Sequence, residues 1–146
     1  MAALMSADRI EATFVDDEHR RLRVGLAILQ EAIADGHRWT RDDAIDRVAR
    51  VLAWLRRDFL PHTTWEEARI YPALDQQARS PWATRALRFE HQQIRELAGL
   101  VELEYDELLE HWNSKVAHGL LAALARLDAV ITSHLAQEER FVTPLI

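Results

Sequence analysis

The sequence predicts an all-α protein folded as an up-down-up-down four-helix bundle, with an internal two-fold repeat of a helical hairpin. Three observations lead to this prediction: apolar residues recur at steps of three and four in four successive segments, the connections between the segments are short, and the chain holds only four glycines and four prolines. Steps of three and four place side chains on one stripe of an α-helix. Long amphipathic helices with short connections pack antiparallel to their chain neighbours, which gives the bundle.

The first helix is expected over residues 12–35, because its apolar stripe is followed by Gly36, a residue typical of the position just after a helix. The second is expected over residues 41–76, because Thr40 and Asp43 have the spacing of a capping pair. The expected interior positions are Val15, His19, Leu22, Leu26, Leu29 and Ile33 in the first helix, and Ile45, Val48, Leu52, Leu55, Phe59, His62, Glu66 and Ile70 in the second.

Pro61 interrupts the second of these helices. Proline removes one backbone hydrogen bond from a helix and crowds the preceding turn, so we expect a kink just before His62. The kink is interpreted either as a bend that the bundle tolerates or as a device that aims His62, and the sequence leaves both interpretations open.

The third helix is expected over residues 81–111, because Ser80 is a good N-cap and proline follows at the first helical position. The fourth is expected over residues 114–142, with Asn113 or Ser114 as its cap. The expected interior positions are Leu87, His91, Ile94, Ala98, Val101, Tyr105 and Leu108 in the third helix, and Leu120, Leu124, Leu127, Ile131, His134 and Glu138 in the fourth.

Composition excludes several classes of function. One domain over residues 1–146 fits the length, and the absence of cysteine excludes disulfide scaffolds, thiolate zinc sites, iron–sulfur clusters and cysteine nucleophiles. The net charge is −6 and no long basic cluster is present, so neither nucleic acid nor an anionic membrane is an expected partner. No apolar stretch of about 18 residues and no targeting sequence are recognised, so we expect a soluble, cytoplasmic protein.

Six polar side chains occupy positions that the bundle pattern assigns to the interior. Burying a carboxylate or an unpaired imidazole costs several kcal/mol, so six of them need a common compensation. A metal centre supplies that compensation. The predicted metal ligands are His19, His62, Glu66, His91, His134 and Glu138.

The two halves of the chain repeat this pattern at one constant offset. Each half has a lone histidine on its first helix and the pattern His-x-x-x-Glu on its second. The matching residues are Glu18 with Glu90, His19 with His91, Arg23 with Arg95, His62 with His134, Glu66 with Glu138, Glu67 with Glu139 and Pro72 with Pro144. We therefore expect two related helical hairpins.

The four histidines of the pattern are expected in one layer of the bundle. In each hairpin, the two histidines lie at similar distances in sequence from the connection between the helices. Because each helix rises about 1.5 Å per residue, the two histidines are expected at the same height along the bundle. A spacing of four places His62 with Glu66, and His134 with Glu138, on one face of a helix. Six such donors exceed what one tetrahedral zinc ion needs and suit two metals bridged by carboxylates. Donors without thiolate favour iron, with manganese or zinc as competitors.

Other polar residues are expected outside the ligand set. Glu67 and Glu139 are rotated by about 100° from their ligand neighbours, although Glu139 stays open as a substitute for Glu138. Arg23 and Arg95 are expected to flank the site and to pair with glutamates. Aromatic residues near the site are interpreted as packing, with a role for Tyr71 as an electron or proton donor left open. Surface positions are expected for His37, His111 and His118.

At these residues the chain resembles the hemerythrin-like family, whose cation-binding module repeats a histidine followed by His-x-x-x-Glu. The resemblance runs from about residue 12 to Pro144 and includes the blocks "HTTWEEARIYP" and "HLAQEERFVTP". It implies a non-haem di-iron centre that binds dioxygen, nitric oxide or peroxide. The ligands that it implies are the same six residues, His19, His62, Glu66, His91, His134 and Glu138.

Two departures from the oxygen-carrying members bear on function. Those members have a fifth histidine one turn along the third helix, where this chain has Leu87 and Arg95 as neighbours of His91. Their last carboxylate corresponds to Glu139, whereas the repeat and the stripe favour Glu138. With an oxo or hydroxo bridge, each iron would have five ligands and one open position. Such a symmetric site suits redox reactivity, nitric oxide or peroxide binding, or iron handling better than transport.

Three hypotheses follow. The protein is a di-iron protein that binds or senses a small diatomic ligand, peroxide, or iron and redox status. Alternatively, it is a di-iron enzyme that reduces peroxide or nitric oxide, or that handles iron in the manner of iron–sulfur repair. The third hypothesis is a plain bundle with incidental histidines, which would carry no stoichiometric metal. No protein partner is identified from the sequence.

Overall fold

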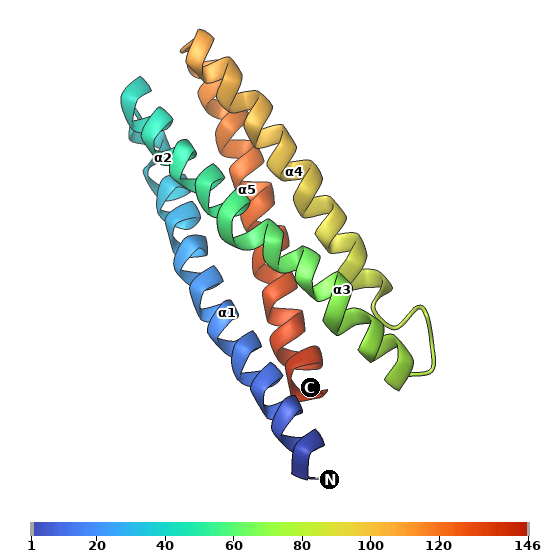
Figure 1. Cartoon of the computed structure of the whole chain (residues 1–146). Coiled ribbons are helices and arrows are strands. Elements are labelled where there is room, and N and C mark those ends of the chain that lie inside the picture. Colours follow the sequence, from blue (N-terminus) through green and yellow to red (C-terminus); the bar gives the residue numbers. More distant parts are fainter. Residues whose placement is uncertain (1, 146) are drawn as a thin grey trace.

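Five α-helices make up the computed structural model, which describes the backbone of residues 2–145 and the side chains of residues 13–145. They are α1 (Ala2–Asp35), α2 (Arg41–Trp54), α3 (Leu60–Gln77), α4 (Arg85–Glu110) and α5 (Ser114–Gln137) (Figure 1). A π-helical turn, η2 (Leu55–Phe59), joins α2 to α3, so these two elements form one long helix of the bundle. A second π-helical turn, η3 (Glu138–Val142), extends α5, and short 3-10 turns follow α1 (η1, Gly36–Arg38) and η3 (η4, Thr143–Leu145).

The helices alternate in direction and close into a ring. α1 contacts both α2 and α5, and α4 contacts the same two helices. Figure 1 shows both ends of the chain at the same end of the molecule, as an up-down-up-down connection requires. The predicted all-α four-helix bundle is therefore confirmed.

Two of the predicted helix starts are confirmed by their caps. Thr40 Oγ1 accepts a hydrogen bond from the Asp43 amide at 3.2 Å, and Asp43 Oδ2 accepts one from the Thr40 amide at 3.1 Å, which is a capping box. At the start of α5, Asn113 Oδ1 accepts a hydrogen bond from the Val116 amide at 3.0 Å. Of the two residues considered for this cap, Asn113 is therefore the one used.

The predicted start of the third helix at residue 81 is wrong, because α4 begins at Arg85. Ser80 Oγ does accept a hydrogen bond from the Trp82 amide at 3.2 Å, but this bond closes a turn. Asp75, at the end of α3, accepts hydrogen bonds from both the amide and the hydroxyl of Thr84 at 2.9 Å. This second anchor holds the chain in a turn until Thr84. The first helix also differs from expectation, since α1 begins at Ala2 instead of residue 12.

Pro61 lies immediately after η2, where we expected a kink. The Leu60 amide donates to the Leu55 carbonyl, five residues back, which is the wider spacing of a π-helix. A widened turn relieves the clash between the proline ring and the carbonyl four residues earlier. The chain thus passes Pro61 without a break, and both Phe59 and His62 stay buried on the same face.

Apolar side chains fill the bundle in two separate clusters. The larger occupies most of the length and includes Leu29, Val48, Val101 and Leu124, each fully buried. The smaller consists of Val15, Ile70, Tyr71, Leu74 and Val142. Along the helices, the six predicted ligands stand between these two clusters, so they form a polar layer across the interior.

The segment Ser114–Leu145 is long and apolar enough to cross a membrane by length and composition alone. This is weak support for a membrane span, because the core helix of a soluble bundle passes the same test. In this structure Leu120, Leu124 and Ile131 of that segment are fully buried inside the bundle.

Gly25 allows α1 to approach the indole ring of Trp54. A Cβ atom at Gly25 would lie 1.9 Å from Trp54 Nε1, and the ring is itself buried and packed against Phe59. Gly25→Ala should therefore lower the stability by about 1–3 kcal/mol, the usual cost of overpacking. Gly99 is the matched control, because a Cβ there meets nothing within 4 Å. Gly99→Ala should stabilise α4 by about 0.5–1 kcal/mol.

Thermal unfolding monitored by circular dichroism measures both changes. We expect a melting temperature lower by roughly 3–10 °C for Gly25→Ala and slightly higher for Gly99→Ala. Equal shifts in the two variants would contradict the packing of Trp54 against Gly25 described above.

Candidate metal centre

The six predicted ligands converge on one place in the bundle. They form two groups of four, in each of which one donor atom per residue lies within 4.8 Å of the others. The first group is His19, His62, Glu66 and Glu138, and the second is Glu66, His91, His134 and Glu138. All six side chains are buried. Two carboxylates are therefore common to both groups, which is the arrangement needed to bridge two cations.

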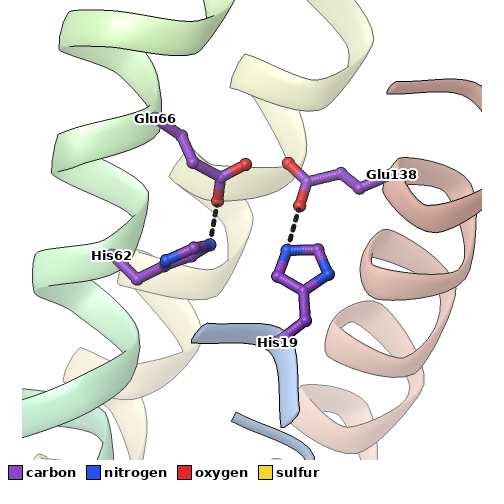
Figure 2. Close-up of side chains that lie close together, drawn as sticks. All are labelled: His19, His62, Glu66 and Glu138. Atoms are coloured by element: carbon purple, nitrogen blue, oxygen red, sulfur yellow. Dashed lines mark ion pairs between the residues drawn. The ribbon is translucent and has the colours of Figure 1, made fainter. Parts of the chain in front are cut away.

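The first group brings together α1, α3 and η3 (Figure 2). His62 Nε2 lies 2.8 Å from Glu66 Oε1, one turn further along α3. His19 Nε2, from α1, lies 3.2 Å from Glu138 Oε2. Figure 2 shows the two carboxylates facing each other with one imidazole below each. The π-helical turn η3 begins at Glu138, so the chain widens where this carboxylate enters the site.

The second group uses the other oxygen of Glu138 and the same oxygen of Glu66 that faces His62. His134 Nε2 lies 3.1 Å from Glu138 Oε1, and His91 Nε2 lies 3.8 Å from Glu66 Oε1. The Nε2 atoms of His91 and His134 are 2.9 Å apart. Each group thus offers two imidazole nitrogens and two carboxylates.

Several donor atoms of the first group lack a hydrogen bond. Among the residues that the structure describes, His19 Nε2, His62 Nε2, Glu66 Oε1 and Glu138 Oε2 are fully buried without a hydrogen-bond partner. Unsatisfied buried polar atoms cost about 1–3 kcal/mol each, so their concentration here needs an explanation. A cation would satisfy all four atoms at once, and the residues present therefore fit a metal site.

His62 and His91 are held in the form that binds metal. Burial, together with the neighbouring His19, lowers the pKa of His62 from 6.5 to about 4. Burial and the neighbouring His134 lower the pKa of His91 to about 4 as well. Both imidazoles are therefore neutral near pH 7, and a neutral imidazole is the form that coordinates a cation.

The two carboxylates have unlike pKa values. Burial, reinforced by the adjacent Glu138, raises the pKa of Glu66 well above its ordinary value. Burial also acts against the ionised form of Glu138, but contacts with Glu66, His134 and His19 outweigh it and lower the pKa of Glu138. In the absence of a cation, one of the two carboxyl groups is thus protonated, because two adjacent buried carboxylates repel each other.

A carboxylate at the rim of the site faces each histidine from outside. The four imidazoles direct Nε2 inward, and each Nδ1 lies near the oxygen of a glutamate. The distances are 3.6 Å for His19 to Glu139, 3.3 Å for His62 to Glu18, 3.1 Å for His91 to Glu67 and 3.4 Å for His134 to Glu90. The contacts of His62 with Glu18 and of His91 with Glu67 are hydrogen bonds, and such partners fix the orientation and the tautomer of a metal-binding imidazole.

The two repeated arginines support this outer layer, as the sequence predicted. Arg23 donates to both oxygens of Glu139 at 2.9 and 2.6 Å, and Arg95 donates to both oxygens of Glu67 at 3.1 and 2.9 Å. Glu139 is occupied by this pairing at the rim, whereas Glu138 belongs to both inner groups. The internal repeat thus extends to these two arginine–glutamate–histidine chains as well.

Removing one rim carboxylate should weaken metal binding without abolishing it. Glu67→Ala leaves His91 Nδ1 without its partner and Arg95 without its counter-ion, so we expect the affinity for a divalent cation to fall about 10- to 100-fold. Competition with a chromophoric chelator measures the affinity. Glu96→Ala is the control, because that carboxylate only contacts Gln92 on the surface. Equal affinities of the two variants would contradict an orienting role for Glu67.

Tyr71 enters the site, although its pattern in the sequence favoured a packing role. Its ring is fully buried, its hydroxyl donates to Glu138 Oε1, and the phenolic oxygen lies 3.1 Å from His91 Nε2. Burial, reinforced by the neighbouring carboxyl groups of Glu66 and Glu138, raises the pKa of Tyr71, so the phenol is neutral. The sequence placed Tyr71 near the site, favoured a packing role and left open a role as an electron or proton donor. The remaining histidines, His37, His111 and His118, are exposed as expected.

Comparison with known proteins agrees with this geometry. A family model described as the hemerythrin HHE cation-binding domain matches residues 11–146, which is nearly the whole chain. No curated protein and no solved structure matches the chain significantly. A domain of the matched family binds metal cations, and the buried histidine and glutamate groups are suited to hold them. The chain therefore belongs to the hemerythrin HHE cation-binding domain family.

Proposed function

We propose that the chain is a non-haem di-iron protein that binds or senses dioxygen, nitric oxide or peroxide, or that reports iron or redox status. The observation that carries the proposal is that two groups of four buried donors share Glu66 and Glu138. Two cations held in these groups would each have two imidazoles and two bridging carboxylates. Bridging by Glu66 and Glu138 is the simplest use of two carboxylates that face both groups.

The chemistry of the donors supports iron. All six donors are nitrogen or oxygen, and the chain contains no cysteine, so a soft thiolate-bound metal is not favoured. Manganese and zinc compete for the same donors. When bound, a pair of iron ions would supply a redox-active centre for small ligands. The chain's own contribution is to exclude water from the six donors and to orient the four imidazoles from the rim.

Elemental measurement on the purified protein tests this proposal. The chain should be purified without a metal-affinity tag, and we expect two iron ions per chain with the visible absorption of oxo-bridged ferric iron. His62→Ala should lose metal and stability, because it leaves the remaining buried donors uncompensated. A wild-type protein without stoichiometric metal, or a His62→Ala variant with two metals and an unchanged melting temperature, would contradict the assignment.

Ligand binding to the reduced protein distinguishes a sensing or reactive centre from an oxygen carrier. Nitric oxide or peroxide should change the visible spectrum of the iron-loaded protein. A stable and fully reversible spectrum with dioxygen would instead favour simple transport. We do not expect this result, because the chain lacks the fifth histidine of the oxygen-carrying members.

The alternative is a di-iron enzyme that consumes peroxide or reduces nitric oxide. Tyr71 favours this candidate, because its neutral hydroxyl holds a proton against Glu138 inside the site. Oxygen release from hydrogen peroxide by the iron-loaded protein tests it. We expect a lower rate in Tyr71→Phe if the phenol takes part, and absence of turnover in the wild-type protein would remove the peroxide-consuming form of this alternative.

A further inference from the structure

A pocket of about 600 Å³ opens at the end of the bundle that holds the C-terminus (Figure 1). It lies between the end of α3, the turn that leads into α4, and the segment from η3 to η4, and its walls include Leu74, Leu87 and Val142. This volume is typical of pockets that bind small molecules. Within the part of the chain that the structure describes, none of the six metal donors lines the pocket, so it is separate from the candidate metal centre.

The lining of the pocket is uncharged. Charged residues make up 29% of the chain, yet all the described residues that line the pocket are neutral. The charged side chains of the neighbouring turn are engaged with each other and with Thr84: Asp75 accepts hydrogen bonds from Thr84 and from Arg88. A charged occupant would lose its hydration here without gaining a counter-ion, which is strongly unfavourable. The pocket therefore suits a neutral molecule.

Gln137 provides a polar contact for the occupant. Its Nε2 donates to Ser133 Oγ at 3.1 Å, so the amide keeps its oxygen as an acceptor. The other buried polar residue of the lining, Thr84, already uses its hydroxyl to donate to Asp75 and to accept from Arg88. An occupant with a hydroxyl group would match the acceptor on Gln137.

The rim of the pocket is apolar and partly aromatic. Phe141 and Leu145 both line it, and they are 60% and 57% exposed. Covering these side chains with an apolar molecule removes their surface from water, which favours binding. A flat ring is well suited to this, because it can pack on the ring of Phe141.

We infer that this pocket binds a small neutral aromatic alcohol, of the phenol or naphthol class, with its ring against Phe141 and its hydroxyl donating to Gln137. Leu74 and Val142 belong both to the pocket wall and to the smaller apolar cluster that contains Tyr71. The occupant therefore lies against the cluster that adjoins the metal centre, but outside the donors themselves. The inference does not rest on the identity or number of the metal ions.

Calorimetric titration of the protein as purified tests the inference with two probes that share one ring system. We expect 2-naphthol to bind saturably, with one molecule per chain, and 2-naphthoate to bind at least about 10-fold more weakly because of its charge. Absence of saturable binding of 2-naphthol, or an equal affinity for 2-naphthoate, would overturn the inference. A new visible band would also overturn it, because such a band is the sign of a naphtholate oxygen bound to ferric iron in the metal centre.

Two variants locate the bound probe. Ala86 is exposed at the start of α4 and lines the pocket, so Ala86→Trp should fill it and abolish the saturable binding of 2-naphthol. Ala68→Trp is the matched control, because it adds the same side chain at an exposed position of α3 outside the pocket and should keep the wild-type affinity. Gln137→Leu removes the acceptor and should lower the affinity for 2-naphthol about 3- to 10-fold.

Unchanged affinity in a folded Ala86→Trp would overturn the inference. If Ala86→Trp does not fold, Gln137→Leu and the preference of the wild-type protein for 2-naphthol decide. A second copy of the chain is the competing occupant, and sedimentation at the concentrations of the titration tests it. A dimer that forms in the wild-type protein but not in Ala86→Trp, without binding of 2-naphthol, would assign the pocket to that second copy and overturn the inference.

Discussion

Glu138→Ala is expected to remove both of the proposed metal ions, whereas His19→Ala is expected to remove one. Glu138 belongs to both groups of donors, and its two oxygens face His19 and His134 respectively. His19 belongs to the first group alone, so its loss leaves the other four donors in place. Metal content per chain, measured after dialysis, should therefore fall from two to near zero in Glu138→Ala and from two to one in His19→Ala.

Glu139→Ala is the control for this experiment. Glu139 is the next residue along the chain, but it lies at the rim with Arg23 and contacts only the outer nitrogen of His19. We expect both metals to remain, with an affinity about 10- to 100-fold lower at most. The assignment of Glu138 as the shared ligand would be wrong if Glu139→Ala lost both metals and Glu138→Ala kept them.

The metal-free protein should lose stability as the pH falls from about 6.5 to about 4. His62 and His91 have a pKa of about 4 in the folded protein, below the ordinary value of 6.5. Between these values the unfolded chain binds protons that the folded chain does not, so falling pH favours unfolding. Each histidine should contribute a loss of roughly 3 kcal/mol when the pH reaches its folded pKa. Urea unfolding at a series of pH values measures the change.

Glu66 acts in the opposite direction and provides the control. Its pKa is raised in the folded protein. Above its ordinary pKa, the carboxyl group must therefore take up a proton when the chain folds, and this cost to the folding stability disappears as the pH falls. In Glu66→Gln this opposing contribution is absent, and stability should fall more steeply with acid than in the wild-type protein. A stability that is independent of pH between 4 and about 6.5 in metal-free Glu66→Gln would contradict the low pKa values of His62 and His91.

Much of the fold and of the inner site could be predicted because both depend on period and repetition. A stripe at steps of three and four determines which face of a helix is buried, whatever the detailed bend of its axis. His62 and Glu66 therefore appear on the inward face in the sequence and in the structure alike. The constant offset between the two hairpins then predicts the second half of the site from the first.

The features that could not be predicted depend on contacts between distant residues. Ser80 followed by proline has the local pattern of a helix start, but Asp75 captures Thr84 and delays the helix to Arg85. The π-helical turns add one residue to a turn without changing the apolar pattern. Tyr71 has the appearance of a packing residue, and only the position of its hydroxyl relative to Glu138 places it in the site.

The polar layer divides the apolar interior into two unequal clusters. This division could couple metal binding to the order of one end of the bundle. Among the residues whose side chains the structure describes, the cluster beyond the layer has Val15, Ile70, Tyr71, Leu74 and Val142 as its buried members, far fewer than the larger cluster. Metal ions bound to side chains of α1, α3, α4 and η3 would stabilise that end of the bundle. Without them, this end should open locally while the larger cluster stays folded, so that amide hydrogen exchange there follows the state of the centre. Binding or loss of the metal ions would then make this end of the molecule more or less ordered.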